Sequence, residues 1–118
     1  GISIGLFSAS VLNLNNMRDI ENDGASGKNT LVVKIGLNKA KIYHLSIILI
    51  GISTSIFYVL QTTFHPINFL FLISFIPLVI HLLKVFQNQI PANLDPELKK
   101  VALSTFLFSI LFWIAINL

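Results

Sequence analysis

Long apolar runs alternate with short polar segments along this chain. The first run covers residues 1–12, and three longer runs cover residues 42–60, 67–86 and 101–118. Because about 20 apolar residues are needed to cross a bilayer as a helix, we expect the three longer runs to span a membrane. The first run is too short to span, and we expect it to be the second half of a helix whose start is missing. The pattern predicts an all-α membrane protein, a transmembrane helix bundle with about four spans here, the first one truncated.

Polar residues and glycines predict where the first half of the chain changes direction. We expect the first helix to continue to about Asp23 and to break at residues 24–27, which include two glycines. Residues 30–36 predict a short helix or turn at the membrane interface, and residues 61–68 predict a short turn between two spans.

In the second half of the chain, prolines predict where helices bend or begin. Pro77 lies inside the third apolar run and predicts a kink there. Residues 87–100 form a polar loop, and Asp95 precedes Pro96 within it. Since aspartate favours the N-cap position and proline the first helical position, we expect Asp95 to cap the last helix.

Composition supports the membrane interpretation. Of the 118 residues, 54% are hydrophobic and 11% are charged, which is too apolar for an ordinary soluble domain. The absence of cysteine excludes disulfide bonds and thiolate metal sites. The formal net charge is +3. In a membrane chain this value reflects which loops face the cytoplasm, so we expect no nucleic-acid partner.

The positive charges of the polar segments alternate. The segment after the first run holds Arg18 and four lysines, residues 61–68 hold no Lys or Arg, and the third segment holds lysines 84, 99 and 100. Positively charged loops tend to stay on the cytoplasmic side. We therefore expect an integral membrane protein, surrounded by the lipid bilayer, whose first and third polar segments are cytoplasmic.

One polar segment concentrates acidic side chains. Asp19, Glu21 and Asp23 are three of the five acidic residues of the chain. On a helix, Asp19 and Asp23 would share one face about 6 Å apart along the axis, and Asn16 would lie on the same stripe. Magnesium prefers oxygen ligands and usually bridges one or two carboxylates to a phosphate. The segment therefore predicts a magnesium site, with a solvated polar helix end as the alternative.

Other ionisable side chains give weaker signals. Lys28 follows Asp23 by five residues, close enough to fold back over the carboxylates, and both a phosphate contact and an ordinary loop charge remain open for it. The histidines, His44, His65 and His81, lack metal-ligand spacing, so we expect them to be interface or packing residues, with His81 the strongest candidate for another role.

The acidic segment also carries a family resemblance. Asn15-Asn16-x-Arg18-Asp19-x-x-x-Asp23, followed by Gly27-Lys28-x-Thr30-Leu31 and Lys34-x-Gly36, resembles the second aspartate-rich motif of the UbiA superfamily of intramembrane prenyltransferases. The Asn-Asn-x-Arg-Asp form is similar to that of the branch that prenylates 1,4-dihydroxy-2-naphthoate. One departure is Asn29, where many relatives have a basic residue. The remaining spans match only in hydropathy and loop length.

The resemblance implies a nine-helix bundle with a cytoplasm-facing cavity. Residues 1–118 would be the C-terminal part of a single polytopic prenyltransferase domain, from the sixth helix to the ninth. It implies that Asp19 and Asp23 are catalytic residues that hold Mg2+. It also implies that the substrate diphosphate is bound by Lys28, Arg18, Asn16 and Asn15. The first aspartate-rich motif is absent here, so we expect this chain alone to be inactive.

The implied function is transfer of a polyprenyl group from a prenyl diphosphate to an aromatic acceptor, 1,4-dihydroxy-2-naphthoate, in menaquinone biosynthesis at a bacterial inner (plasma) membrane. Ionising an allylic diphosphate leaves an anion, so magnesium and cationic side chains suit the chemistry. One alternative is another UbiA-type enzyme, of the 4-hydroxybenzoate, haem O or chlorophyll type. Another is a non-catalytic membrane bundle or cation transporter, against which the absence of Asp and Glu from the three longer runs argues.

Overall fold

Helices account for nearly all of the residues that this computed structural model describes, 1–62 and 65–118. Thr63 and Phe64 of the expected turn lie outside the described residues. No strand occurs in the described part of the chain. In chain order the helices are α1 (Ile2–Arg18), α2 (Ile20–Ala25), α3 (Leu31–Ile35), α4 (Leu37–Leu60), the 3-10 helix η1 (Pro66–Ser74), α5 (Phe75–Gln87), the 3-10 helix η2 (Pro91–Leu94) and α6 (Asp95–Asn117).

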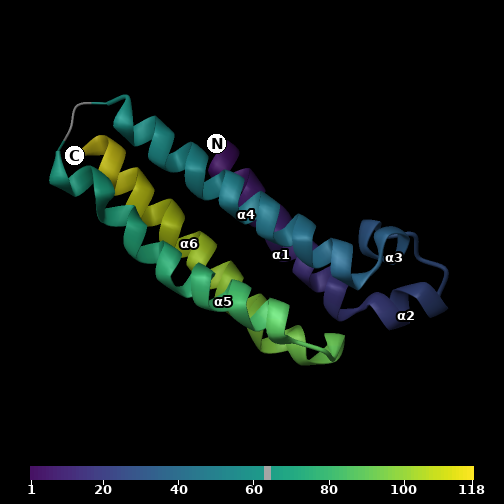
Figure 1. Cartoon of the computed structure of the whole chain (residues 1–118). Helices are drawn as coiled ribbons and strands as arrows, with labels where there is room; N and C mark the ends of the chain where they lie inside the picture. Colours follow the sequence, from purple (N-terminus) through teal and green to yellow (C-terminus); the bar gives the residue numbers. More distant parts are fainter. Residues whose placement is uncertain (63–64) are drawn as a thin grey trace.

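The long helices lie side by side in an elongated bundle that measures 51 × 21 × 18 Å (Figure 1). α1 packs along α4 and also contacts α6, while η1 and α5 pack along α6. At one end, α2 and α3 extend beyond the bundle, and the connection from α5 to α6 lies at this same end (Figure 1). The C-terminus lies at the opposite end (Figure 1). The two positively charged polar segments thus share one end of the bundle.

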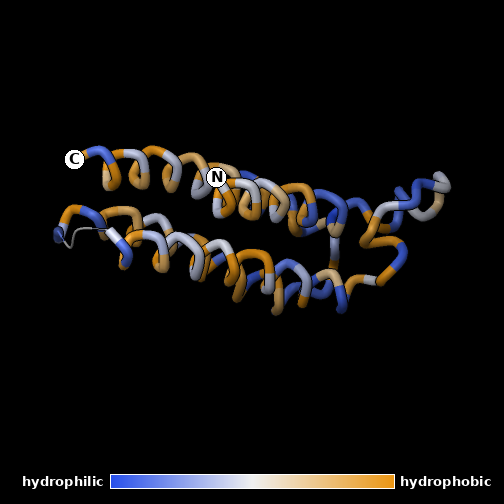
Figure 2. The backbone as a smooth tube through the Cα atoms, turned by 90° about the horizontal axis from the view of Figure 1, so that it is seen from above, coloured by the Kyte–Doolittle hydropathy of each residue, from blue (hydrophilic) through white to orange (hydrophobic). Residues whose placement is uncertain are grey.

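Three segments are long and apolar enough to cross a membrane, as judged by length and composition: Leu37–Leu60, Pro66–Gln87 and Pro91–Asn117. They coincide with the three longer apolar runs, so the predicted fold class is confirmed. Apolar residues predominate along the middle of the long helices, and polar residues lie toward both ends, including the end that carries α2 and α3 (Figure 2). Many large apolar side chains on these spans are exposed, which suits a surface in contact with lipid.

The first helix is interrupted within the acidic motif. The prediction of one helix to about Asp23 is wrong, because α1 ends at Arg18 and α2 begins at Ile20. Asp19, between them, has φ −95° and ψ 9°, away from helical values. The backbone N–H of Asp23 still donates to the Asp19 carbonyl at 2.8 Å. The interruption is therefore confined to one residue.

The last helix begins at Asp95, within one residue of the start that Asp95-Pro96 predicted and before the apolar run 101–118. Its N-cap is Leu94, and Asp95 makes no capping hydrogen bond, so the predicted N-cap role of Asp95 is wrong. The physical reason is that the Asp95 carboxylate accepts a hydrogen bond from Arg18 instead. Because α6 starts here, Asp95 and Glu97 belong to a membrane-length segment. Both acids lie in the first turn of α6, before the apolar run 101–118, which holds no Asp or Glu.

The third span changes helical type along its length, from the 3-10 helix η1 to α5 at Phe75. The change falls just before Pro77, at which a kink is predicted. Proline cannot donate to the carbonyl four residues earlier, here that of Ile73, and its ring crowds that carbonyl. The altered geometry on the N-terminal side of Pro77 is consistent with this effect.

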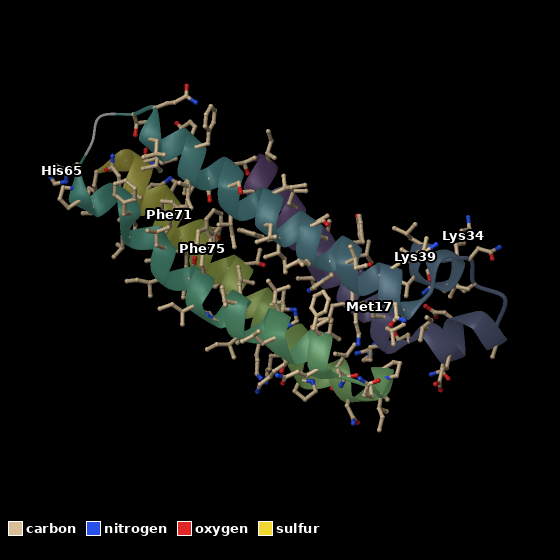
Figure 3. The ribbon with its side chains drawn as sticks, viewed as in Figure 1. Met17, Lys34, Lys39, His65, Phe71 and Phe75 are labelled. Carbon is tan, nitrogen blue, oxygen red and sulfur yellow. The ribbon has the colours of Figure 1, made fainter. Side chains whose placement is uncertain are left out.

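An aromatic cluster fills the centre of the bundle. Phe7, Phe71, Phe75 and Phe108 come from α1, η1, α5 and α6, and all are buried. The rings of Phe7 and Phe108 meet edge to face with centroids 4.9 Å apart. Figure 3 shows Phe71 and Phe75 pointing from their span into the bundle. A Cβ atom at Gly51 of α4 would lie 2.6 Å from the Phe7 ring, so glycine there lets α1 and α4 approach closely.

Candidate functional site

The end of α1 presents a cluster of charged and amide side chains around Arg18. The Arg18 Nε and Nη2 donate to the two carboxylate oxygens of Asp19, each at 2.8 Å. Nη2 also donates to Asn15 Oδ1 at 2.9 Å, and Nη1 donates to Asp95 Oδ1 at 2.7 Å. The hydrogen bonds from Arg18 hold the pKa of Asp19 below its usual value. Asp19 is therefore an ionised carboxylate in a fixed orientation at neutral pH.

Asp23 and Lys28 form the second part of the site. The backbone N–H of Lys28 donates to the Asp23 carbonyl at 2.9 Å, and that of Gly27 donates to the Gly24 carbonyl at 3.3 Å. These are the two bonds of a Schellman helix end, which needs a left-handed residue, and Gly27 supplies it with φ +76°. This turn brings the Lys28 Nζ to 3.5 Å from Asp23 Oδ1. The chain thus folds back as the spacing predicted.

The two aspartates differ in what their oxygens contact. Both oxygens of Asp19 are bound by Arg18. Asp23 is buried, and its Oδ2 has no hydrogen-bond partner among the residues that the structure describes. A buried charged oxygen without a partner is costly, so Asp23 Oδ2 is a position where a ligand would relieve that cost.

Asn16 and Glu21, the other polar residues of this segment, make fewer contacts with their surroundings. Asn16 is half-buried, and its side chain makes no hydrogen bond within the described part of the chain. Glu21 is exposed. The structure therefore brings Asn15, Arg18 and Asp19 into one cluster and pairs Asp23 with Lys28, whereas Asn16 has no such contact.

A magnesium ion fits these residues in part. Within residues 1–62 and 65–118, no group of three or more His, Cys, Asp or Glu side chains converges as a metal site. Asp23, with its buried free oxygen, offers one carboxylate ligand, and Mg2+ in proteins usually takes one or two carboxylates while substrate phosphates and water complete its shell. The donor set is all oxygen, which also favours magnesium over softer metals.

The candidate site lies at the lysine-rich end of the bundle. Figure 3 shows Lys34 and Lys39 at this end and His65 at the other. The Lys41 Nζ donates to the Asn88 carbonyl at 2.6 Å and so joins the two positively charged polar segments. Both segments therefore face the same side of any membrane that the bundle crosses.

A second polar feature lies inside the bundle. His44 Nε2 and His81 Nε2 are 2.8 Å apart, His81 Nδ1 is 2.9 Å from Glu97 Oε2, and Lys100 Nζ donates to Glu97 Oε1 at 2.6 Å. Asn13 Nδ2 lies 3.5 Å from His44 Nδ1 and donates to the Ala40 carbonyl. We call this set the buried polar chain; its buried members are Asn13, His44, His81 and Glu97, and Lys100, whose side chain is 40% exposed, joins it from the surface.

One arrangement of protons satisfies the whole buried polar chain when both imidazole rings are neutral. The Glu97 carboxylate accepts from His81 Nδ1–H, which leaves His81 Nε2 as an acceptor for His44 Nε2–H. His44 Nδ1 is then an acceptor that faces the amide N–H of Asn13. The hydrogen bonds from Asn13 to Glu97 therefore all point in one direction, from α1 through α4 and α5 to α6, and Lys100 donates to Glu97 from within α6.

The sequence predicts the contacts of the buried polar chain only weakly. His44 and His81 lie near the same end of neighbouring predicted spans, and intramembrane ionisable groups tend to pair with one another. The expectation that His44 and His81 are packing residues does not include this pairing. Glu97 lies in the predicted first turn of the last helix, and its contact with His81 depends on how that helix packs against α5, which the sequence does not determine.

Comparison with known proteins identifies relatives. The model of the UbiA prenyltransferase family matches residues 1–110. A 1,4-dihydroxy-2-naphthoate octaprenyltransferase of Haemophilus influenzae is 35% identical over 111 residues, which cover 94% of this chain and 36% of that protein. The Escherichia coli protein of the same name is 32% identical over 114 residues, covering 97% of this chain and 37% of that protein. No solved structure matches.

Proposed function

Because the chain belongs to the UbiA prenyltransferase family, we propose that it acts in the transfer of a polyprenyl group from a prenyl diphosphate to an aromatic acceptor. The proposed acceptor is 1,4-dihydroxy-2-naphthoate, which would place the protein in menaquinone biosynthesis at a bacterial inner membrane. The names of the two relatives and the Asn15-Asn16-x-Arg18-Asp19 form of the motif support this choice.

The chain spans little more than a third of the length of these relatives. We therefore propose that residues 1–118 are the C-terminal part of a single polytopic prenyltransferase domain. A first aspartate-rich motif would come from the preceding part of that domain, and the chain alone would be inactive. The positive charges at one end of the bundle support a cytoplasm-facing active site.

The observation that carries the proposal most directly is the Asp23 carboxylate. It is buried, its Oδ1 faces Lys28, and its Oδ2 has no partner in the described part of the chain. A buried carboxylate oxygen without a hydrogen-bond partner, beside a lysine ammonium, suits a site that binds a metal–diphosphate complex. Magnesium, when bound, would neutralise negative charge on the departing diphosphate.

The protein residues have separable roles in this proposal. Asp19 and Asp23 hold the metal ion and are the proposed catalytic residues. Lys28 and the remaining Arg18 N–H donate to diphosphate oxygens, where the negative charge grows as the allylic carbon–oxygen bond breaks. Asn15 orients Arg18, and Asn16 offers an amide to the diphosphate. The electron-rich acceptor ring then attacks the allylic carbon, and loss of CO2 follows.

The test offers a choice of acceptor to the full-length protein in membranes. With Mg2+ and a long prenyl diphosphate present, equal concentrations of 1,4-dihydroxy-2-naphthoate and 4-hydroxybenzoate compete, and products are identified by mass spectrometry. We expect the prenylated, decarboxylated naphthoate product. Preference for the benzoate would move the protein to another branch of the family, and the absence of both products from folded protein would refute the proposal.

A further inference from the structure

Arg18 lies between the aspartate motif and the last helix. Its guanidinium makes two hydrogen bonds to Asp19, one to Asn15 and one to Asp95. A guanidinium has five N–H donors, so these bonds leave one N–H on Nη1 for a substrate oxygen. The paired bonds to Asp19 have the planar, two-point geometry that fixes a carboxylate in orientation as well as in position.

Asp95 provides the long-range part of this arrangement. Asp19 and Asn15 are one and three residues from Arg18, whereas Asp95 is 77 residues away, in α6. The bond from Arg18 Nη1 to Asp95 Oδ1 is 2.7 Å long. Contacts with near neighbours move together with the end of α1, so they cannot fix Arg18 relative to the rest of the bundle. The contact with Asp95 can fix Arg18 relative to the bundle, because Asp95 belongs to α6.

The backbone around Asp95 is itself held in place. Leu94, directly before it, is buried, and Glu97, two residues later, is buried within the polar chain that reaches Asn13 of α1. The side chain of Asp95 is 70% exposed and Pro96 is exposed too, whereas Leu94 and Glu97 on either side of them are buried. The backbone that carries the Asp95 carboxylate is therefore fixed in the bundle where that carboxylate contacts Arg18.

Because the helix is interrupted at Asp19, the direction of the Asp19 side chain depends on its contact with Arg18 and therefore on the contact between Arg18 and Asp95. A continuous helix would set the direction of the Asp19 side chain, but the backbone at Asp19 departs from helical values. Misplacing a reacting or binding group by about 1 Å can cost about 100-fold in rate. Exposed ion pairs, in contrast, contribute little to folding stability. Loss of the Asp95 contact should therefore affect the site much more than the fold.

We infer that Asp95 is a positioning residue for the diphosphate site and acts on Asp19 through Arg18. The inference rests on the proposed function, since it requires Asp19 to take part in binding magnesium and diphosphate. In this role Asp95 joins the polar segment before α6 to the aspartate motif and holds the Asp19 carboxylate where the metal–diphosphate complex binds.

The first experiment uses the full-length protein and measures equilibrium binding of a prenyl thiodiphosphate, an inert donor analogue, as Mg2+ is varied. Asp95→Asn should raise the half-saturating Mg2+ concentration about tenfold and leave the unfolding temperature unchanged. Asp95→Glu keeps the charge and should restore most of the affinity. The matched control is Glu21→Gln, which removes an exposed carboxylate from the same motif and should bind like the wild type.

The second experiment tests the route through Arg18. If Asp95 acts only by holding Arg18, then Asp95→Asn should have no further effect in a protein that already carries Arg18→Gln. Effects that multiply in the double variant would overturn the inference. Wild-type binding by Asp95→Asn alone would overturn it too, and so would unfolding of that variant, because the contact would then be structural.

Asp19→Asn, measured beside these variants, separates this inference from the proposed function. If Asp19→Asn binds the analogue and magnesium like the wild type, the proposed site is wrong. If Asp19→Asn loses magnesium-dependent binding while Asp95→Asn retains it in full, the proposed site stands and only the positioning role of Asp95 fails.

Discussion

Replacing Asp23 by asparagine changes the candidate site with very little change in shape. The side chain keeps its volume, loses its charge and exchanges one oxygen for an amide nitrogen. Asp23 Oδ2 is buried and has no partner among the described residues, and Oδ1 lies 3.5 Å from an exposed Lys28 ammonium. Because the Lys28 end of this pair is exposed, the pair contributes about 0–1 kcal/mol to folding. The free energy of unfolding should therefore change by less than about 1 kcal/mol.

The expected effect on catalysis is much larger. If Asp23 is a metal ligand, its loss removes stabilisation of the charge that develops on the departing diphosphate. Removing one such preorganised electrostatic contact costs about 3–4 kcal/mol, or about two to three decades in turnover. The combination of a large loss in rate and a small change in stability distinguishes a functional carboxylate from a structural one.

The assay measures initial rates of naphthoate prenylation by the full-length protein against Mg2+ and prenyl diphosphate concentration. Detergent size exclusion and thermal unfolding report on the fold. Glu21→Gln is the matched control, since Glu21 is an exposed acid two residues from Asp23. Near wild-type rates for Asp23→Asn would refute the reasoning and leave the acidic segment as a polar helix end.

The remaining predictions concern binding, topology and packing. Lys28→Ala should lower kcat/KM for prenyl diphosphate about tenfold, because one charge-assisted hydrogen bond to the diphosphate is lost; an unchanged kcat/KM in steady-state assays would contradict the contact. Single cysteines replacing Lys28 or Asn93 should react with an impermeant maleimide only from the cytoplasmic side, and one replacing His65 only from outside; external labelling at Asn93 would exclude this topology. Gly51→Ala should destabilise the bundle by about 1–3 kcal/mol, because the new methyl would overlap the buried Phe7 ring; an unchanged unfolding temperature would refute that expectation.

Features that depend on local sequence could be predicted. The three spans follow from runs of apolar residues, and the helix end that brings Lys28 to Asp23 follows from glycines just after a polar helix. The short helix α3 forms where residues 30–36 predicted it, with the Thr30 hydroxyl accepting from the Val33 N–H at 3.2 Å. In each case the determining interactions lie within a few residues of one another.

Features that depend on contacts between distant segments could not be predicted. Asp95 looks like an N-cap in sequence, and only the bundle shows that Arg18 competes for its carboxylate. The pairing of His44 with His81 likewise requires α4 and α5 to meet at the same depth. The interruption at Asp19 has no glycine or proline to mark it.

The measurement that tests the central claim most directly is binding of a prenyl thiodiphosphate to the folded full-length protein with and without Mg2+. The claim is that Asp19 and Asp23 hold magnesium against the donor diphosphate. We predict that the wild type binds the analogue much more tightly with Mg2+ than without it, and that the Asp19→Asn/Asp23→Asn double variant loses this difference. A double variant that remains folded and keeps the full magnesium-dependent gain in affinity would contradict the claim.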